Sequence, residues 1–61
     1  MNTLMERRKE KNISLKELSM STGISERYLR FLEKGERTPS IKTAGSIANA
    51  LNTSIDDLFN N

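Results

Sequence analysis

The side chains best suited to binding chemistry lie on one stripe of a short segment. Arg27, Phe31 and Lys34 recur at spacings of four and three residues, which places them on one side of a helix. Leu29 and Leu32 fall on the opposite side, where they would face a core. Guanidinium and ammonium groups donate hydrogen bonds to anionic oxygens, so the stripe predicts contact with an acidic partner such as a phosphate backbone.

The charge distribution points in the same direction. All ten Lys and Arg residues lie within residues 1–42, where six acidic residues leave a net charge of +4. Residues 43–61 carry only two charged residues, Asp56 and Asp57. A basic side with an acidic far end suits a protein that docks on phosphates, although chance clustering on a solvated helix surface explains the pattern equally well.

Catalytic and metal chemistry find little support in the composition. The 61 residues contain no Cys and no His, which removes thiolate sites, the commonest general base and the commonest zinc ligand. Asp56 and Asp57 are adjacent, so their side chains diverge on a helix and cannot act as a paired acid and base. We therefore expect no enzyme, no metal and no cofactor.

Length and hydropathy limit the architecture. A chain of 61 residues fits one domain, residues 1–61. Such a chain buries only about 60% of its unfolded surface, so a partner subunit would add stability. No apolar run approaches the roughly 20 residues that span a bilayer, and the N-terminus has no signal-peptide segment. We expect a cytoplasmic protein without membrane contact.

Start and stop signals divide the chain into five short helices without strands. Serine or threonine opens each helix, because its hydroxyl can cap the free backbone N–H groups there. The expected helix starts are Thr3, Ser14, Ser25, Ser40 and Ser54. Glycine and asparagine, which tolerate a left-handed backbone, end the helices. The expected stops are Asn12, Gly23, Gly35 and Asn52.

Apolar spacing predicts which helix faces enter the core. The fourth helix has one apolar face, made of Ile41, Ala44, Ile47, Ala48 and Leu51. Because several core positions carry small residues, we expect Met20 or Phe31 to lean into the core. Gly45 lies inside the same helix, where glycine costs about 1 kcal/mol relative to alanine.

The stretch from residue 15 to residue 34 carries most of the functional information. Its two helices are joined by the three-residue turn Thr22-Gly23-Ile24, which forces them to cross steeply. Ser19 is small enough to let the helices approach. The apolar residues spaced to fill the angle between them are Leu18, Ile24, Leu29 and Leu32. This pattern is typical of a DNA-binding helix-turn-helix, although two helices of an ordinary bundle also produce it by chance.

Over nearly the whole chain, the sequence also resembles the Cro/Xre-type, phage-repressor-like helix-turn-helix regulators. The matching segments occur in the same order and without gaps. They are Ile13-Ser14, Glu17-Leu18, Gly23-Ile24-Ser25, Leu32-Glu33-Lys34-Gly35, Pro39-Ser40, Ala50-Leu51 and Ser54-Ile55-Asp56-Asp57-Leu58. The resemblance implies an all-α, lambda-repressor-like domain with the helix-turn-helix at its second and third helices. It further implies a bacterial or phage-encoded transcriptional regulator, a repressor, that binds double-stranded DNA.

By similarity to the family, Glu26, Arg27 and Phe31 fall at base-reading positions of a recognition helix, residues 25–34, in the major groove. Arg27 suits a bidentate bond to guanine, Glu26 can accept from a cytosine amino group, and Phe31 can touch a thymine methyl. Glu26 has an alternative role in complementing the helix dipole. Phe31 has an alternative role in packing against a neighbouring helix or a partner subunit.

A second group of residues is expected at the phosphate backbone, where contacts position a protein without reading sequence. Its members are Ser14, Lys16, Arg30, Lys34 and Arg37. Ser14 and Lys16 stand at a helix N-terminus, whose dipole attracts an anion. A solvated surface charge is the alternative for each basic member.

The family also implies a structural pair, Arg8 with Glu33, that ties the first helix to the third. One departure from the family pattern is Leu15, which stands where many members carry a glutamine that braces the recognition helix and a phosphate. Leu15 can do neither by hydrogen bonding, so that part of the interface is not carried over.

Useful sequence specificity usually requires a twofold dimer with half-sites about 34 Å apart, so we expect a homodimer on a palindromic operator. The candidate dimer contacts are the turn after the third helix and Ile55, Leu58 and Phe59, with a core position as the alternative for Ile55 and Leu58. The rival hypothesis is a protein-interaction module on the same fold, such as an antitoxin or a bridging factor. Its partner would be a protein, for example a toxin or an anti-repressor.

Overall fold

The computed structural model describes residues 3–59, which form five helices joined by turns and contain no strand. The helices are α1 (Thr3–Glu10), α2 (Leu15–Thr22), α3 (Glu26–Glu33), α4 (Ile41–Ala50) and α5 (Ile55–Phe59). The predicted all-α fold with five short helices is therefore confirmed. No helix within this range is long and apolar enough to cross a membrane.

Serine caps determine where four of the helices begin. In each case the serine Oγ accepts a hydrogen bond from the backbone N–H three residues later, at 3.0 to 3.1 Å. The capping residues are Ser14, Ser25, Ser40 and Ser54. In α2 the Glu17 carboxylate also accepts from the Ser14 N–H at 2.8 Å, completing the predicted capping box. Thr3 is the first residue of α1 rather than the residue before it, and the position before it lies outside the described residues.

Left-handed backbone positions follow four of the helices, as predicted. Gly23 and Gly35 have φ of 75°, and Asn12 and Asn52 have φ of 56° and 55°. After Asn12, Gly35 and Asn52 the chain turns back, and the next N–H bonds to the carbonyl five residues earlier at 2.9 to 3.1 Å. These bonds satisfy carbonyls that would otherwise be left unpaired at the helix ends.

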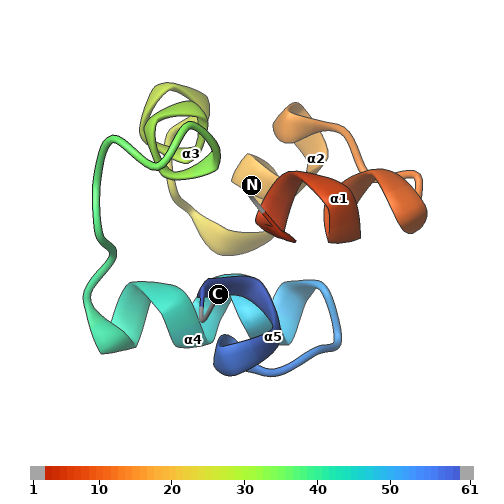
Figure 1. Ribbon diagram of the computed structural model, residues 1–61. Coiled ribbons are helices and arrows are strands. Elements are labelled where there is room, and N and C mark those ends of the chain that lie inside the picture. The colour runs from red at the N-terminus through yellow and green to blue at the C-terminus, as the bar shows by residue number, and fades with distance from the viewer. Residues whose placement is uncertain (1–2, 60–61) are drawn as a thin grey trace.

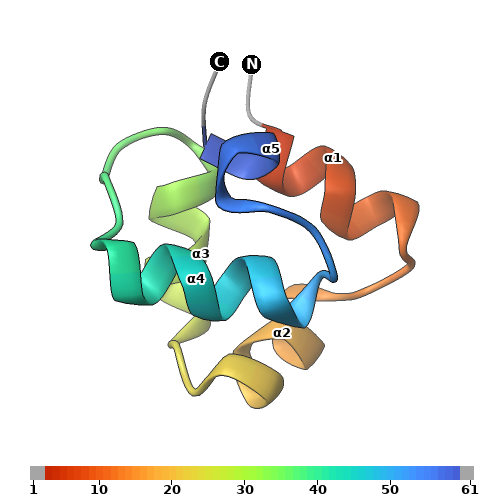
Figure 2. The ribbon, with the colours of Figure 1, turned by 90° about the horizontal axis from the view of Figure 1, so that it is seen from below.

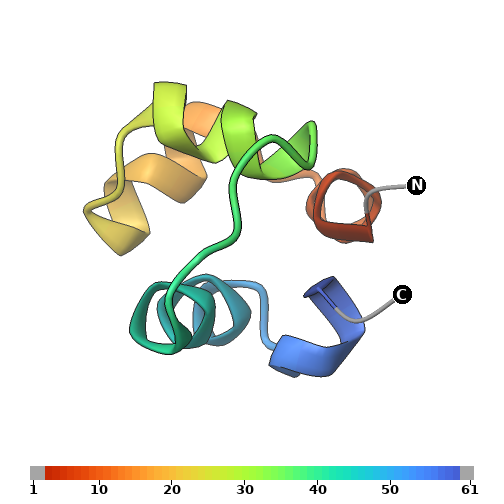
Figure 3. The ribbon, with the colours of Figure 1, turned by 60° about the vertical axis from the view of Figure 1, so that its left-hand side comes forward.

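The helices are arranged in two layers. Figures 1 and 3 show α1, α2 and α3 in the upper layer and α4 with α5 in the lower one, joined by the segment 34–40. α4 packs against α2, and α5 packs against α1 and α4 (Figure 2). The core between the layers is made of Leu4, Leu18, Leu29, Leu32, Ile47, Ala48, Leu51 and Leu58.

Two apolar residues expected in the core lie outside it. Ile41 is 83% exposed and Met20 is 75% exposed. Ile41 is the first residue of α4, at the outer end of the lower layer (Figure 1), beyond the buried Ala44 one turn later. Met20 follows the buried Leu18 by two residues, which turns its side chain about 200° away around the helix.

Candidate nucleic-acid interface

The connection between α2 and α3 sets the direction of α3. Only residues 23–25 separate the two helices, and the Gly23 N–H bonds to the Ser19 carbonyl at 2.8 Å. Thr22 Oγ1 donates to the Leu18 carbonyl at 2.8 Å and accepts from the Ile24 N–H at 3.2 Å. The Thr22 hydroxyl therefore closes the turn. Sequence reasoning missed this role, which the side-chain preference of threonine for local backbone bonds could have indicated.

α3 separates its two faces as the periodicity predicts. Leu29 and Leu32 are buried, whereas Arg27 and Lys34 are exposed and Phe31 is half-buried. Figure 3 shows α3 in the upper layer, on the side of the molecule opposite α4 and α5. The basic stripe of α3 is therefore presented on a scaffold whose hydrophobic packing lies behind it.

Two arginine side chains from different parts of the chain contact the Phe31 ring. The Arg27 Cζ and the Arg37 Cζ each lie 5.7 Å from the centroid of the Phe31 ring. Arg27 is one turn earlier on α3, whereas Arg37 belongs to the turn that follows the helix. Both contacts have the distance of a cation–π interaction.

The other two charged residues of the exposed side interact with each other. Arg30 Nη2 lies 3.7 Å from Glu26 Oε1, and both side chains remain largely exposed. Such an exposed pair one helix turn apart contributes only about 0.3–0.5 kcal/mol, so either residue can exchange it for another partner.

A nearly buried ion pair anchors the end of α3 to α1. Arg8 Nε donates to Glu33 Oε2 at 2.6 Å, and Arg8 Nη1 donates to the Ile13 carbonyl at 2.9 Å. The Arg8 and Glu33 side chains are only 11% and 7% exposed. Within the described residues no buried side-chain nitrogen or oxygen lacks a hydrogen-bond partner. Arg8 therefore fixes both the last turn of α3 and the loop that leads into α2.

The N-terminus of α2 lies beside the C-terminal end of α3. Leu15 and Lys34 line one open depression of about 320 Å³, together with Met5, Arg30 and Glu33. Leu15 also packs against the edge of the core, so it contributes apolar contacts where many members of the resembled family have glutamine. Ser14 and Lys16, the neighbours of Leu15 in the chain, are exposed at this end of α2.

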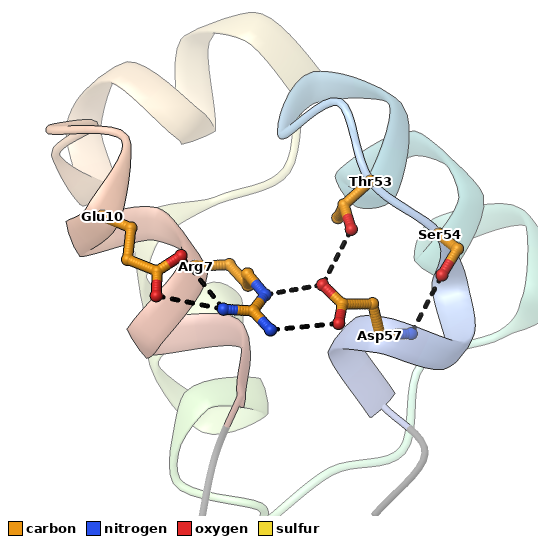
Figure 4. Close-up of polar contacts among 5 residues, drawn as sticks. All are labelled: Arg7, Glu10, Thr53, Ser54 and Asp57. Carbon is orange, nitrogen blue, oxygen red and sulfur yellow. Dashed lines mark hydrogen bonds and ion pairs between the residues drawn. The ribbon is translucent and has the colours of Figure 1, made fainter.

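A second ion pair, which the sequence analysis missed, joins α1 to α5. Arg7 Nε and Nη2 donate to the two Asp57 carboxylate oxygens at 2.6 and 3.1 Å, and Thr53 Oγ1 donates to Asp57 Oδ2 at 2.8 Å (Figure 4). The hydrogen bonds from Arg7, and after them that from Thr53, lower the pKa of Asp57 below its usual value. The bonds to Asp57 and Glu10 raise the pKa of Arg7. Fifty residues separate Arg7 from Asp57, so no local spacing indicated the contact.

The predicted dimer contacts divide into buried and exposed residues. Leu58 is only 2% exposed and belongs to the core between the two layers, so the core alternative is correct for Leu58 and it offers no dimer surface. Ile55 is 37% exposed and Phe59 is half-buried.

No group of three acidic residues among residues 3–59 is placed to hold a metal ion.

Comparison with known proteins agrees with this geometry. A helix-turn-helix family model matches residues 4–58. Two proteins of Archaeoglobus fulgidus, both described as uncharacterized HTH-type transcriptional regulators, are 40% identical over 48 residues and 36% identical over 56 residues. The first alignment covers 79% of this chain and 68% of the relative, and the second covers 92% and 80%. A regulator of the same description from Sinorhizobium fredii is 38% identical over 47 residues, covering 77% of this chain and 61% of the relative.

The family match extends from the first helix to the last. It confirms the resemblance predicted from the sequence words, and it places the chain among DNA-binding proteins that are not enzymes. The chain belongs to the Cro/Xre-like helix-turn-helix family of transcriptional regulators.

Proposed function

We propose that this regulator is a repressor that binds a palindromic operator as a homodimer and inserts α3 into the major groove. The observation that carries the proposal is the exposed stripe of Arg27, Phe31 and Lys34 on a helix whose opposite face is buried. A helix held on its inner face can approach base edges without reorganising, and the major groove is wide enough to admit it.

Base recognition is assigned to the first half of α3. Arg27 is exposed and has the five donors that match guanine O6 and N7. Glu26 is assigned to a cytosine amino group, which it can bind once its weak pair with Arg30 exchanges. Phe31 is assigned to a nearby thymine methyl. Discrimination is expected to be strongest where Arg27 contacts guanine, at about 1–3 kcal/mol for a bidentate contact.

Phosphate contacts are assigned to the two ends of the stripe. Lys34 and Arg37 are exposed where the chain leaves α3, and Arg30 supplies a further charge once it separates from Glu26. Ser14 and Lys16 bind a second phosphate at the start of α2, where the helix dipole favours an anion. Each neutralised phosphate steepens the dependence of affinity on salt.

The dimer surface is assigned to the outer side of α4 and α5. Ile41 and Gly45 are one turn apart on α4, and a Cβ on Gly45 would lie 3.9 Å from Ile55 Cδ1. Ile41 and Ile55 are exposed apolar residues, so the three positions form one strip. Covering this strip with a second copy would remove apolar surface from water.

Selection from a random duplex library at two salt concentrations tests the proposal. We expect enrichment of one palindromic site, a steep loss of affinity with salt, and relaxed sequence choice for Arg27→Ala. Lys9→Ala removes the same charge from the exposed side of α1 and is expected to weaken binding without changing sequence choice. Weak binding without any preferred sequence would contradict the proposal and favour a protein partner instead.

A further inference from the structure

The C-terminal turn of α3 folds the chain back onto the helix. Gly35 takes a left-handed φ of 75°, and the Glu36 N–H bonds to the Phe31 carbonyl at 2.9 Å. This hydrogen bond reverses the chain immediately before Arg37. The Arg37 guanidinium then reaches the Phe31 ring, with its Cζ at 5.7 Å from the centroid. The turn therefore brings residue 37 back toward α3, within reach of the Phe31 ring.

Arg27 and Arg37 share the ring but have no acidic partner. Each Cζ lies 5.7 Å from the same centroid, so the two guanidiniums are separated by no more than twice that distance. No ion pair or hydrogen bond within residues 3–59 is made by either guanidinium. Two like charges held this close and left unneutralised are suited to an anionic ligand that engages both.

The contact with the ring leaves the hydrogen-bonding groups of each guanidinium available. A cation–π contact uses the positive charge of the guanidinium and forms no hydrogen bond, so it does not consume the N–H donors. The ring therefore restricts each arginine side chain without occupying its donors. A side chain that is already restricted loses less entropy on binding. The free-energy cost of ordering a long side chain is about 0.5–1.5 kcal/mol.

We infer that Phe31 is a positioning residue that couples Arg27 and Arg37, so that base recognition by Arg27 depends on the phosphate contact of Arg37. This inference rests on the proposed function and assigns Phe31 a role other than direct contact with a thymine methyl. A distance of at most twice 5.7 Å lies within the major groove width of about 12 Å, so one guanidinium can meet a base edge while the other meets the flanking backbone.

A double-mutant cycle in DNA binding tests the coupling. In the wild-type background we expect the effects of Arg27→Ala and Arg37→Ala on DNA affinity to be non-additive. The fold-loss of affinity in the double variant should be about three to five times smaller than the product of the two single fold-losses. In a Phe31→Leu background the coupling should disappear. Lys34→Ala is the control, because the cation–π contacts of the Phe31 ring among the described residues come from Arg27 and Arg37. The loss of affinity caused by Lys34→Ala should multiply with that of Arg27→Ala in either background.

Sequence choice provides a readout that a purely structural role would leave unchanged. An independent phosphate contact weakens binding equally for all sequences. We expect Arg37→Ala and Phe31→Leu instead to relax discrimination at the base pair that Arg27→Ala affects. Phe31→Tyr, which keeps the ring, should retain that discrimination to within about twofold, and circular dichroism verifies that each variant is folded.

The outcomes separate the two proposals. If the wild type shows no preference for any duplex, the proposed function fails and the inference fails with it. If the wild type selects an operator while the cycle is additive, or while Phe31→Leu keeps full discrimination, the repressor proposal stands and the positioning role of Phe31 is overturned.

Discussion

Arg8 joins α1 to the last residue of α3 through Glu33, with 2.6 Å between Arg8 Nε and Glu33 Oε2. Both side chains are nearly buried. Removing either one would leave the charge of the other unpaired and lower the free energy of unfolding. The pair therefore fixes the C-terminal end of the helix to which we assign base recognition.

Glu33→Gln should lower the free energy of unfolding by about 3 kcal/mol, because it leaves the buried Arg8 guanidinium without a counter-charge. Urea unfolding followed by circular dichroism measures the change. Glu36→Gln is the matched control at an exposed position, with an expected change within about 0.5 kcal/mol. Equal stability of the two variants would show that the pair contributes little to the fold.

Gly45→Ala should raise the free energy of unfolding by about 1 kcal/mol, because alanine has the higher helix propensity and its Cβ meets Ile55 Cδ1 at an ordinary 3.9 Å. Gly23→Ala is the contrasting variant. Open space surrounds a Cβ there, but the φ of 75° is left-handed, so we expect a loss of about 1 kcal/mol. Thermal unfolding of both variants beside the wild type shows whether each substitution stabilises or destabilises the fold. Stabilisation by both substitutions would refute the argument from backbone conformation.

Asp57→Asn should lower the melting temperature at neutral pH, because it removes the carboxylate that Arg7 and Thr53 bind. The pKa of Asp57 is lowered in the folded state, so the unfolded chain binds more protons between the folded and unfolded pKa values. The Asp57 carboxylate therefore stabilises the fold above about pH 4, near its pKa in the unfolded chain. This stabilisation is lost as the pH falls through the pKa of Asp57 in the folded chain.

Melting temperatures of the wild type and of Asp57→Asn should therefore converge on acidification below about pH 4. Asp56→Asn makes the same change of charge on the neighbouring exposed residue and should leave the melting temperature nearly unchanged at neutral pH. A constant difference between the wild type and Asp57→Asn at all pH values would show that the contribution of Asp57 does not depend on its charge.

Ile41→Lys should dissociate the proposed dimer while leaving the fold of each chain intact, because the side chain is 83% exposed and packs against no core. Sedimentation velocity gives the oligomeric state, and circular dichroism reports the fold. Met20→Lys makes the same change at an equally open position of α2 and should leave a dimer. If both variants sediment as the wild type does, the strip around Ile41 is not the interface.

The helix boundaries were predictable because they depend on local chemistry. Ser14 and Ser25 bond to backbone groups three residues away, and Gly35 supplies the positive φ within its own turn. Both partners in such an interaction are close in the sequence, so the spacing of residue types predicts where it forms. The buried Leu29 and Leu32 followed from helical periodicity in the same way.

The contacts that depend on tertiary placement were missed or misassigned. Asp57 meets Arg7 across 50 residues, and Arg37 contacts Phe31 after the turn at Gly35. Ile41 fits the apolar periodicity of α4 but lies at its uncovered end. Periodicity gives the direction of a side chain around its own helix, whereas burial depends on whether another element covers that point.

The two ion pairs that join α1 to other helices come from consecutive residues. Arg7 binds Asp57 on α5, and Arg8 binds Glu33 on α3. Release of α1 therefore breaks the link to α5 and the link to α3, the helix to which we assign base recognition, at the same time. Slow amide exchange in α1 and in the last turn of α3 should then share one opening free energy. Because α1 holds both α3 and α5 through these pairs, we expect any opening of α1 to release both helices together.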